Sequence, residues 1–412
     1  MSRSLIIKNA HLVTPLGNSA RHGAEMKQLH TVEDAVIAVR DGRIAYVGTS
    51  LQEAEQAAGE HQVIDAKGCA VLPGFVDSHT HLTFGGSRPD EFEMRLRGAS
   101  YMDIMRAGGG IQSTVNATRS ATAAELAAKA RPVIESMADM GVTTLEGKSG
   151  YGLCVEAERT QLEAMRLLSD DPELPLTLVP TFMGAHAVPT EFKGRTADYV
   201  DHVISDMLPA FKDAAVFCDV FTEKDVFELD DTRRLLNAAK ALGYKVKLHA
   251  DEIVTLGGAE LAAELGATSA DHLLHLSDAG IEALAKSDTV ATLLPLTAFS
   301  LRDSYAPARR MIDAGCAVAL ATDFNPGSCS SYSVPLMIAL AGIYMSMSTE
   351  EIVTALTLNG AAALALAEET GSIETGKRAD IIVLRTANPR DLLYNFGINQ
   401  VETVIAAGKV IK

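Results

Sequence analysis

Val71-Leu-Pro-Gly-Phe-Val-Asp-Ser-His-Thr-His81 is the stretch that decides how this chain is interpreted. It is an apolar run that ends in two histidines. In an extended chain, residues i and i+2 point to the same side, so His79 and His81 converge on one point without strain. Neutral imidazole is a common ligand for divalent transition metals. The pair is therefore a candidate half of a metal site, against the alternative of two core or surface histidines that happen to be close.

The middle of the chain alternates predicted strands with predicted amphipathic helices. The strands are residues 75–82, 142–146, 176–183, 216–222, 245–250, 268–272, 290–295 and 317–323. The clearest helices are residues 123–140, 156–168, 231–242 and 280–286. Eight parallel strands alternating with helices predict an α/β fold, the (β/α)8 TIM-like barrel. A doubly wound sheet is the alternative, but no glycine fingerprint follows the first strand.

Both ends of the chain have the pattern of β structure. Residues 5–13 form a short apolar strand, and Asp41-Gly42 separates two further apolar runs as a strong hairpin signal. Near the other end, residues 379–384 predict a buried strand and residues 401–412 contain a turn. We expect residues 1–68 and 368–412 to form a composite β-sandwich domain, and residues 69–367 to form the barrel.

Composition narrows the classes of function. The 412 residues carry a formal net charge of −17, which argues against nucleic acid or an anionic membrane as partner. We see neither the order of residues typical of a signal peptide nor an apolar run long enough to span a bilayer. The five cysteines are odd in number and widely spaced, which predicts reduced thiols and a cytoplasmic location.

Polar residues stand where several predicted strands end, and in a barrel of this kind the active site lies at the C-terminal ends of the strands. His79 and His81 follow the first strand, His249 ends the fifth and Asp323 ends the eighth. The simplest assembly is these four side chains around one metal ion, with one coordination position open for water, as in catalytic metal sites. Structural zinc sites are closed and often rich in cysteine, and the sequence has no cysteine cluster.

Two further residues complete a hydrolytic set with the ligand Asp323. His272 would hydrogen-bond the water or a developing oxyanion, and Glu252 would move a proton from the water to a leaving nitrogen. The alternatives are that His272 only orients a metal ligand and that Glu252 makes an outward salt bridge. A second metal is not favoured, because the fourth strand ends without a lysine that could bridge two ions. Lys148, after the second strand, is interpreted as structural or adjacent to substrate.

The run Pro73–His81 resembles the strand-one signature of the metal-dependent amidohydrolase superfamily, and the run Gly376–Leu384 is also typical of that group. Five further runs are more specific: Phe84–Arg88, Gly108–Arg119, Lys148–Gly152, Thr181–His186 and Ala321–Ser328. Together they resemble the branch of the superfamily that acts in histidine degradation, and the resemblance extends over nearly the whole chain. One departure is Thr222, where that branch often has cysteine; it does not touch the predicted metal ligands.

The resemblance implies hydrolysis of the cyclic amide of 4-imidazolone-5-propanoate to N-formimidoyl-L-glutamate. It implies that one zinc or iron ion per subunit is held by the same four ligands, and that the protein is a homodimer. The residues it places against substrate or product are Arg88, Tyr151, His186, Glu252, Asn325, Gly327 and Ser328. An arginine fork suits the carboxylate tail of such a substrate. The apolar stretch 334–345 would pack either on the barrel or on a partner subunit.

Two other functions remain open from the sequence. One is an aminohydrolase that releases ammonia from a nucleobase with the same metal and base. Arg88 argues against it, because a nucleobase has no carboxylate. The other is a non-catalytic assembly protein on the same barrel, and the complete ligand set argues against that.

Overall fold

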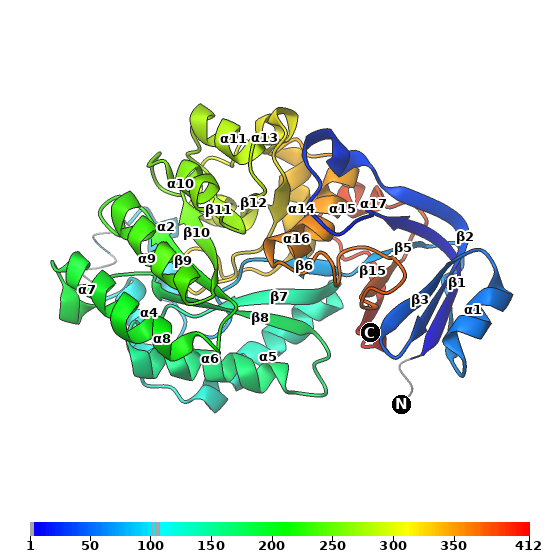
Figure 1. Cartoon of the computed structure of the whole chain (residues 1–412), viewed down its shortest axis with the longest axis horizontal. Coiled ribbons are helices and arrows are strands. Elements are labelled where there is room, and N and C mark those ends of the chain that lie inside the picture. Colours follow the sequence, from blue (N-terminus) through cyan, green and yellow to red (C-terminus); the bar gives the residue numbers. More distant parts are fainter. Residues whose placement is uncertain (1–3, 100–102, 104–107) are drawn as a thin grey trace.

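The larger part of the molecule is a barrel of parallel strands surrounded by helices (Figure 1). A computed structural model describes residues 4–99, 103 and 108–412. The barrel strands are β6 (Phe75–Asp77), β7 (Val142–Lys148), β8 (Thr177–Ala185), β9 (Phe217–Thr222), β10 (Lys245–Ala250), β11 (Ser269–His272), β12 (Val290–Leu293) and β13 (Val318–Leu320). Each strand pairs in parallel with the next along the chain. The predicted (β/α)8 barrel is therefore confirmed, with all eight strands near their predicted positions.

The barrel closes through the segments that follow its first and last strands. Thr80 and Phe324 form an isolated parallel bridge between these segments. The N–H of Asp323 donates to the carbonyl oxygen of His79 over 3.0 Å, and the N–H of His81 donates to that of Phe324 over 2.9 Å. The seam of the barrel is thus made by the backbone of the residues that were predicted to hold a metal.

The helices lie on the outside of the barrel (Figure 1). Along the chain they are α2 (Pro89–Leu96), α4 (Ile111–Arg119), α5 (Ala123–Asp139), α6 (Val155–Ser169), α7 (Thr196–His202), α8 (Leu208–Phe211), α9 (Leu229–Ala241), α10 (Gly258–Leu265), α11 (Asp278–Ala285), α12 (Pro295–Leu301), α13 (Ala308–Ala314), α14 (Val334–Ile343), α15 (Thr349–Leu356) and α16 (Leu358–Ala363). Short 3-10 or π turns occupy Gly23–Lys27, Thr190–Phe192 and Val203–Met207. The helix α5 begins at a capping box, in which Thr122 and Glu125 each accept a hydrogen bond from the other's backbone N–H.

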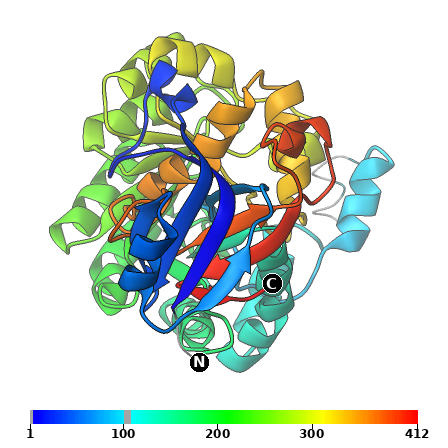
Figure 2. The same ribbon diagram turned by 90° about the vertical axis from the view of Figure 1, so that its right-hand side faces the viewer.

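A second sheet contains strands from both ends of the chain and lies beside the barrel (Figure 2). Its order is β16-β15-β14-β5-β1-β2-β3, with β4 beside β1. The strands are β1 (Leu5–Thr14), β2 (His30–Arg40), β3 (Arg43–Gly48), β4 (Gln62–Asp65), β5 (Ala70–Pro73), β14 (Ile381–Leu384), β15 (Val401–Ala406) and β16 (Lys409–Val410). Two short helices, α1 (Leu51–Ala58) and α17 (Asp391–Tyr394), accompany it. The predicted small β domain built from both termini is confirmed.

One predicted boundary is corrected. Residues 69–73 were assigned to the barrel, but β5 pairs with β1 and with β14 of the terminal sheet. The apolar run before His79 therefore contains two strands in different sheets. Gly74 separates them, and a Cβ atom there would lie 2.3 Å from the Thr143 hydroxyl oxygen, so only glycine fits this crossing point.

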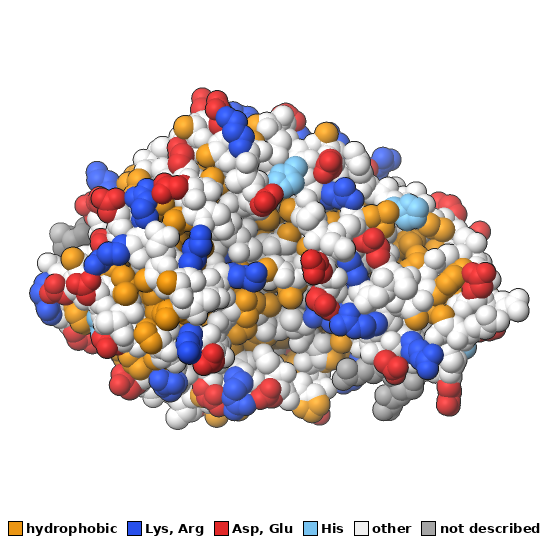
Figure 3. Space-filling model, in the orientation of Figure 1, with side chains coloured by type: hydrophobic (Ala, Val, Ile, Leu, Met, Phe, Trp, Pro, Cys, Tyr) orange, Lys and Arg blue, Asp and Glu red, His pale blue; other side chains and the backbone are white. Residues whose placement is uncertain are grey.

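The apolar stretch 334–345 packs mainly on its own chain. Most of α14 is buried, but Ile343 and Tyr344 at its end are 59% and 62% exposed. Within the described ranges, no helix has the length and apolar character needed to cross a membrane. On the face shown in Figure 3, basic side chains are interspersed with acidic ones, in keeping with a surface that has no strong attraction for polyanions.

Candidate functional site

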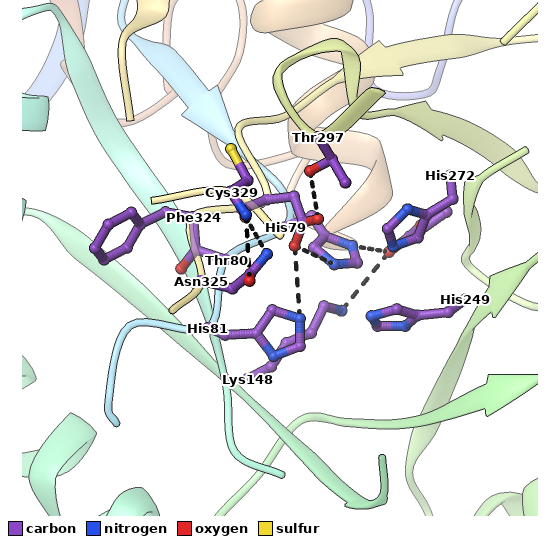
Figure 4. A network of polar contacts seen from close by, with 12 residues as sticks. His79, Thr80, His81, Lys148, His249, His272, Thr297, Phe324, Asn325 and Cys329 are labelled. Carbon is purple, nitrogen blue, oxygen red and sulfur yellow. Dashed lines mark hydrogen bonds and ion pairs between the residues drawn. The ribbon is translucent and has the colours of Figure 1, made fainter. Parts of the chain in front are cut away.

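His79 and His81 follow β6 in an extended segment at the mouth of the barrel. Their rings are buried, and the ring centroids lie 5.4 Å apart. The Nε2 atoms of His79 and His81 lie 3.5 and 3.7 Å from Oδ1 of Asp323, which comes from the end of the last strand. Figure 4 shows the imidazoles of His79, His81, His249 and His272 turned toward a common space.

Hydrogen bonds to carboxylates orient two of these imidazoles. His79 donates through Nδ1 to Asp271 over 2.6 Å, and His249 donates through Nδ1 to Asp219 over 3.1 Å. These contacts leave both Nε2 atoms for another partner, and Nε2 of His79 is buried without a hydrogen-bond partner among the described residues. A buried polar atom without a partner is costly unless a ligand or ion satisfies it.

The donor atoms form two overlapping groups that share His79. Nitrogen and carboxylate atoms of His79, His81 and Asp323 lie within 4.8 Å of one another, and so do those of His79, His249 and His272. Thr297 donates to Oδ2 of Asp323 over 2.6 Å, which leaves Oδ1 to face the histidines. A set of imidazole nitrogens and one carboxylate oxygen fits a zinc or iron ion by ligand type.

Burial sets the protonation of these groups. It lowers the pKa of His79 and of His81 well below the ordinary value of 6.5, so both imidazoles are neutral. Burial also acts against the charged form of His249, but the Asp219 carboxylate prevails and raises the pKa of that imidazole. Burial raises the pKa of Asp323 to about 6. Metal ligands must be deprotonated, and neutral imidazoles meet that need.

Two residues of the site have a backbone conformation that side chains other than glycine rarely adopt. The φ angles of His272 and Asp323 are 79° and 51°. Such strained residues persist where the surrounding structure holds them, and they cluster at active sites. Here the conformation turns the chain sharply at the ends of β11 and β13.

His272 and Glu252 lie beside each other next to the donor groups. Nε2 of His272 is 3.6 Å from Oε2 of Glu252, and both ring nitrogens of His272 are buried without a hydrogen-bond partner in the described part of the chain. Burial, and next the Asp323 carboxylate, raise the pKa of Glu252 to about 8. Burial lowers the pKa of His272 well below its ordinary value. Glu252 points inward, not into an outward salt bridge, and is placed to hold or release a proton near neutral pH.

One cavity of about 280 Å³ connects these groups. Its walls include all seven side chains and backbone groups that were predicted to meet substrate or product: Arg88, Tyr151, His186, Glu252, Asn325, Gly327 and Ser328. His81, His249, His272 and Asp323 also line it, whereas His79 lies deeper. His186 stacks on His81 with ring centroids 4.9 Å apart, and Tyr151 lies 5.0 Å from His186, so these rings form one aromatic wall.

Comparison with known proteins identifies the family. Residues 70–411 match the model of the amidohydrolase family. The chain is 56% identical over 411 residues to imidazolonepropionase of Bacteroides fragilis, covering 99% of both chains. The chain belongs to the imidazolonepropionase family of amidohydrolases. It is also 52% identical to imidazolonepropionase of Clostridium tetani, covering 99% of this chain and 98% of that one.

The fold is shared more widely than the family. The structure matches 5-methylcytosine deaminase of Klebsiella pneumoniae with a TM-score of 0.74 at 17% identity, covering 99% of this chain and 97% of that one. This likeness concerns the architecture alone.

In this member of the imidazolonepropionase family, a cluster on α2 forms the charged end of the cavity. Arg88 precedes the helix and pairs with Glu91, with Nη2 and Oε2 2.7 Å apart. Arg95 donates to the carbonyl oxygen of Gly327 over 2.9 Å. Glu91 and Arg95 were not predicted from the sequence, although their spacing of three and seven residues from Arg88 places all three on one helix face. Two guanidinium groups and one carboxylate give this end of the cavity a net positive charge.

Three other cavity residues were missed because they are apolar: Ile111, Phe221 and Leu301. The loop after Asp323 also differs in detail from the prediction. The N–H groups of Gly327 and Ser328 both donate to Oδ1 of Asn325 over 2.8 Å, so they hold the loop and do not point to a ligand. The hydroxyl of Ser328 is engaged with the same side chain, because it accepts from Nδ2 of Asn325 over 2.9 Å and donates to Oδ1 over 3.2 Å. What remains for a ligand there is the outer surface of the loop.

Lys148, predicted to be either structural or adjacent to substrate, does not line the cavity, which favours the structural alternative. It is buried below the histidines, together with Asp219 and Asp271, to which no role was assigned from the sequence. Strand alternation gives a signal for such residues: Lys247 stands two positions before His249 and so points to the same inner side of the barrel.

Proposed function

We propose that this protein hydrolyses the cyclic amide of 4-imidazolone-5-propanoate to N-formimidoyl-L-glutamate with one zinc or iron ion. The observation that carries the proposal is that His81, Glu252 and Arg88 line the same cavity. One end thus offers donors for a metal and a proton carrier, and the other offers a positive charge for a carboxylate tail. The names of the relatives in Bacteroides fragilis and Clostridium tetani support the same substrate.

In this proposal His79, His81, His249 and Asp323 hold the metal. When bound, such an ion lowers the pKa of water and polarises a carbonyl group. His272 is the alternative donor, because its two ring nitrogens lack partners among the described residues. Zinc and iron both suit these ligand types, so elemental analysis has to decide between them.

The protein side chains orient the substrate and move the proton. Arg88, with Arg95 behind it, binds the propanoate carboxylate, and the planar ring lies against Tyr151 and His186. Glu252 accepts a proton from the attacking water and delivers it to the ring nitrogen that leaves as the amide C–N bond breaks. The oxygen of water becomes part of the new carboxylate.

His272 serves the developing negative charge on the carbonyl oxygen. A neutral imidazole keeps one N–H, and both of its ring nitrogens have no partner in the described structure, so that N–H is available to donate. Donors already aimed at the place where charge develops are usually the strongest contribution to catalysis.

The test is to follow the loss of imidazolone ultraviolet absorbance on adding purified enzyme, with elemental analysis of the same sample. Turnover with about one zinc or iron per subunit supports the proposal. A metal-loaded protein that leaves this substrate intact but releases ammonia from a nucleobase would instead identify an aminohydrolase. Protein that takes up no metal and stays inactive after zinc or iron is added would point to a non-catalytic role.

We also propose a homodimer. Large apolar side chains are exposed at the adjoining ends of α14 and α17, where Leu393 packs against Gly342. They are Ile343, Tyr344, Tyr394, Phe396 and Ile398, each at least 59% exposed. Burying such a patch against a second copy stabilises an association. Light scattering of the wild type and of Tyr394→Glu tests this, and a wild-type monomer would refute it.

A cytoplasmic location is proposed as well. All five cysteines are unpaired, as expected for a protein in a reducing compartment. Fractionation of the native cells checks it.

A further inference from the structure

A group of charged side chains lies below the candidate metal ligands, inside the barrel. It comprises Glu146, Lys148, Asp219, Lys247 and Asp271, and all five are completely buried. None of them lines the active-site cavity. Burying charges is costly unless each is paired, so an arrangement of five requires an explanation.

The two lysines share the same carboxylates. Nζ of Lys148 lies 2.6 Å from Asp219 Oδ2 and 2.9 Å from Glu146 Oε2. Nζ of Lys247 lies 2.9 Å from the same Glu146 oxygen and donates to the carbonyl oxygen of Ser78 over 2.8 Å. Both ammonium groups are 3.6 Å from Oδ2 of Asp271.

Each aspartate connects a lysine to a candidate metal ligand. Asp219 contacts Lys148 through Oδ2 and His249 through Oδ1. Asp271 accepts from His79 through the same Oδ2 that faces both lysines, and Ser269 fixes its other oxygen over 2.6 Å. Figure 4 shows Lys148 extending toward the space between His79 and His249. The contacts therefore run from lysine to aspartate to histidine along two lines, through Asp219 to His249 and through Asp271 to His79, and Lys148 belongs to both.

The net charge of these five buried side chains matches a cation bound above them. Three carboxylates stand against two ammonium groups, which leaves one negative charge in excess when all are ionised. Asp323 supplies another, and a divalent cation offsets both. The third cluster of potential ligand atoms, that of His79, Glu146 and Asp271, is not a second metal site, because the two lysine ammonium groups already contact its carboxylates.

We propose that Lys148 and Lys247 are positioning residues of the metal centre. They hold the carboxylates of Asp219 and Asp271 in place, so that the Nδ1 atoms of His249 and His79 are fixed by hydrogen bonds and the Nε2 atoms face the metal. The proposal rests on the proposed function in one respect only, that a metal binds between these histidines. A role as simple counterions that stabilise the fold is the competing explanation.

A pair of variants separates positioning from charge balance. Lys148→Met removes one ammonium group, and Lys148→Met/Glu146→Gln restores the excess of one negative charge while Asp219 still lacks its donor. We expect the double variant to regain most of the stability of the wild type, yet to bind zinc 10- to 100-fold more weakly in competition with a chelator. Lys286→Met, at a lysine whose side chain is 76% exposed, is the matched control and should change neither quantity.

A spectroscopic signal adds a readout that does not depend on activity. In metal-free wild type, the Nδ1–H protons of His79 and His249 should give sharp, slowly exchanging imidazole signals in ¹⁵N NMR. In the double variant, the His249 signal should broaden or disappear. Should Lys148→Met fail to fold in both forms, Lys247→Met with Glu146→Gln is measured in the same way, with His79 as the reporter.

Zinc affinity and imidazole signals equal to wild type in the charge-balanced variant would overturn the proposal and leave the lysines as counterions. If the wild type itself binds neither zinc nor iron, the proposed metal centre fails instead, and the two failures are thus distinct.

Discussion

The backbone N–H of Asp323 donates to the carbonyl oxygen of His79 over 3.0 Å, and this hydrogen bond joins the last strand of the barrel to the first. The side chains of the same two residues lie 3.5 Å apart, from Nε2 to Oδ1. A cation held between these side chains and the hydrogen bond between their peptide units therefore stabilise the same seam. Metal binding and closure of the barrel are expected to be coupled.

Removing the metal with a chelator should loosen this seam. Hydrogen exchange should become faster at the amides of Asp323 and His81, while the amides of β8, a strand that carries no proposed metal ligand, keep their protection. A ligand that binds only the folded state stabilises it by about 2.7 kcal/mol when its free concentration is 100 times its Kd. The thermal midpoint should thus fall on chelation and recover when zinc or iron is added. Equal exchange with and without metal would contradict the coupling.

Replacing the proposed proton carrier should separate chemistry from metal binding. Glu252→Gln keeps the shape of the side chain but cannot accept a proton, so kcat should fall by roughly 10²- to 10⁴-fold. Metal content should stay at the wild-type level, because Glu252 is not among the proposed ligands. Assays of imidazolone absorbance measure kcat, and elemental analysis measures the metal content. Near-normal turnover would remove Glu252 from the mechanism.

The pH profile of kcat/KM should carry an acidic limb that belongs to Glu252. Burial raises the pKa of this carboxyl from its ordinary 4.5 to about 8, and a cation beside Asp323 counters part of the rise. With a cation bound, we expect the pKa of Glu252 to lie between its ordinary 4.5 and about 8. The ionised carboxylate accepts the proton, so kcat/KM should fall about tenfold for each pH unit below that pKa. Initial rates from pH 5 to 9 measure the limb. Finding the same limb in Glu252→Gln would assign it to another group.

The arginines of the α2 cluster should determine preference for a carboxylate tail. Losing a hydrogen bond to a charged group costs roughly 1.5–3 kcal/mol, so Arg88→Gln should raise KM about 10- to 150-fold. Arg95→Gln should raise KM less, because one of its N–H groups is engaged with Gly327. An analogue whose tail is a neutral amide should bind wild type and variants alike. Arg97→Gln is the control, at a side chain on the same segment that is 77% exposed, and a similar loss there would refute the assignment.

The sequence predicts the parts of this molecule that depend on local pattern. Apolar runs that stop at His79, His249 and Asp323 predicted the strands and also their catalytic ends, because strand ends in a barrel share one mouth. The place of β5 was not predictable in the same way. Its apolar residues fit either sheet, and only the tertiary pairing with β14 decides between them.

The pairing of the buried charges was not predictable for a different reason. Glu146, Lys148 and Lys247 have the composition of a solvated surface, since such residues are almost never fully buried unless paired. Lys148 has one partner on its own strand, Glu146, but Asp219 is 71 positions away, so no local window contains the whole set. Arg95 was missed because its partner, the carbonyl of Gly327, is 232 positions away.

The terminal sheet has a consequence for the order of synthesis. Its strand β5 is complete when residue 73 leaves the ribosome, but its neighbour β14 begins only at residue 381. During most of translation, that edge of the nascent sheet is open, and open edges are templates for wrong pairing between chains. A cell that makes this protein must therefore protect an early strand until residues 381–384 emerge, so a truncation before β14, far from the chemistry, should promote aggregation.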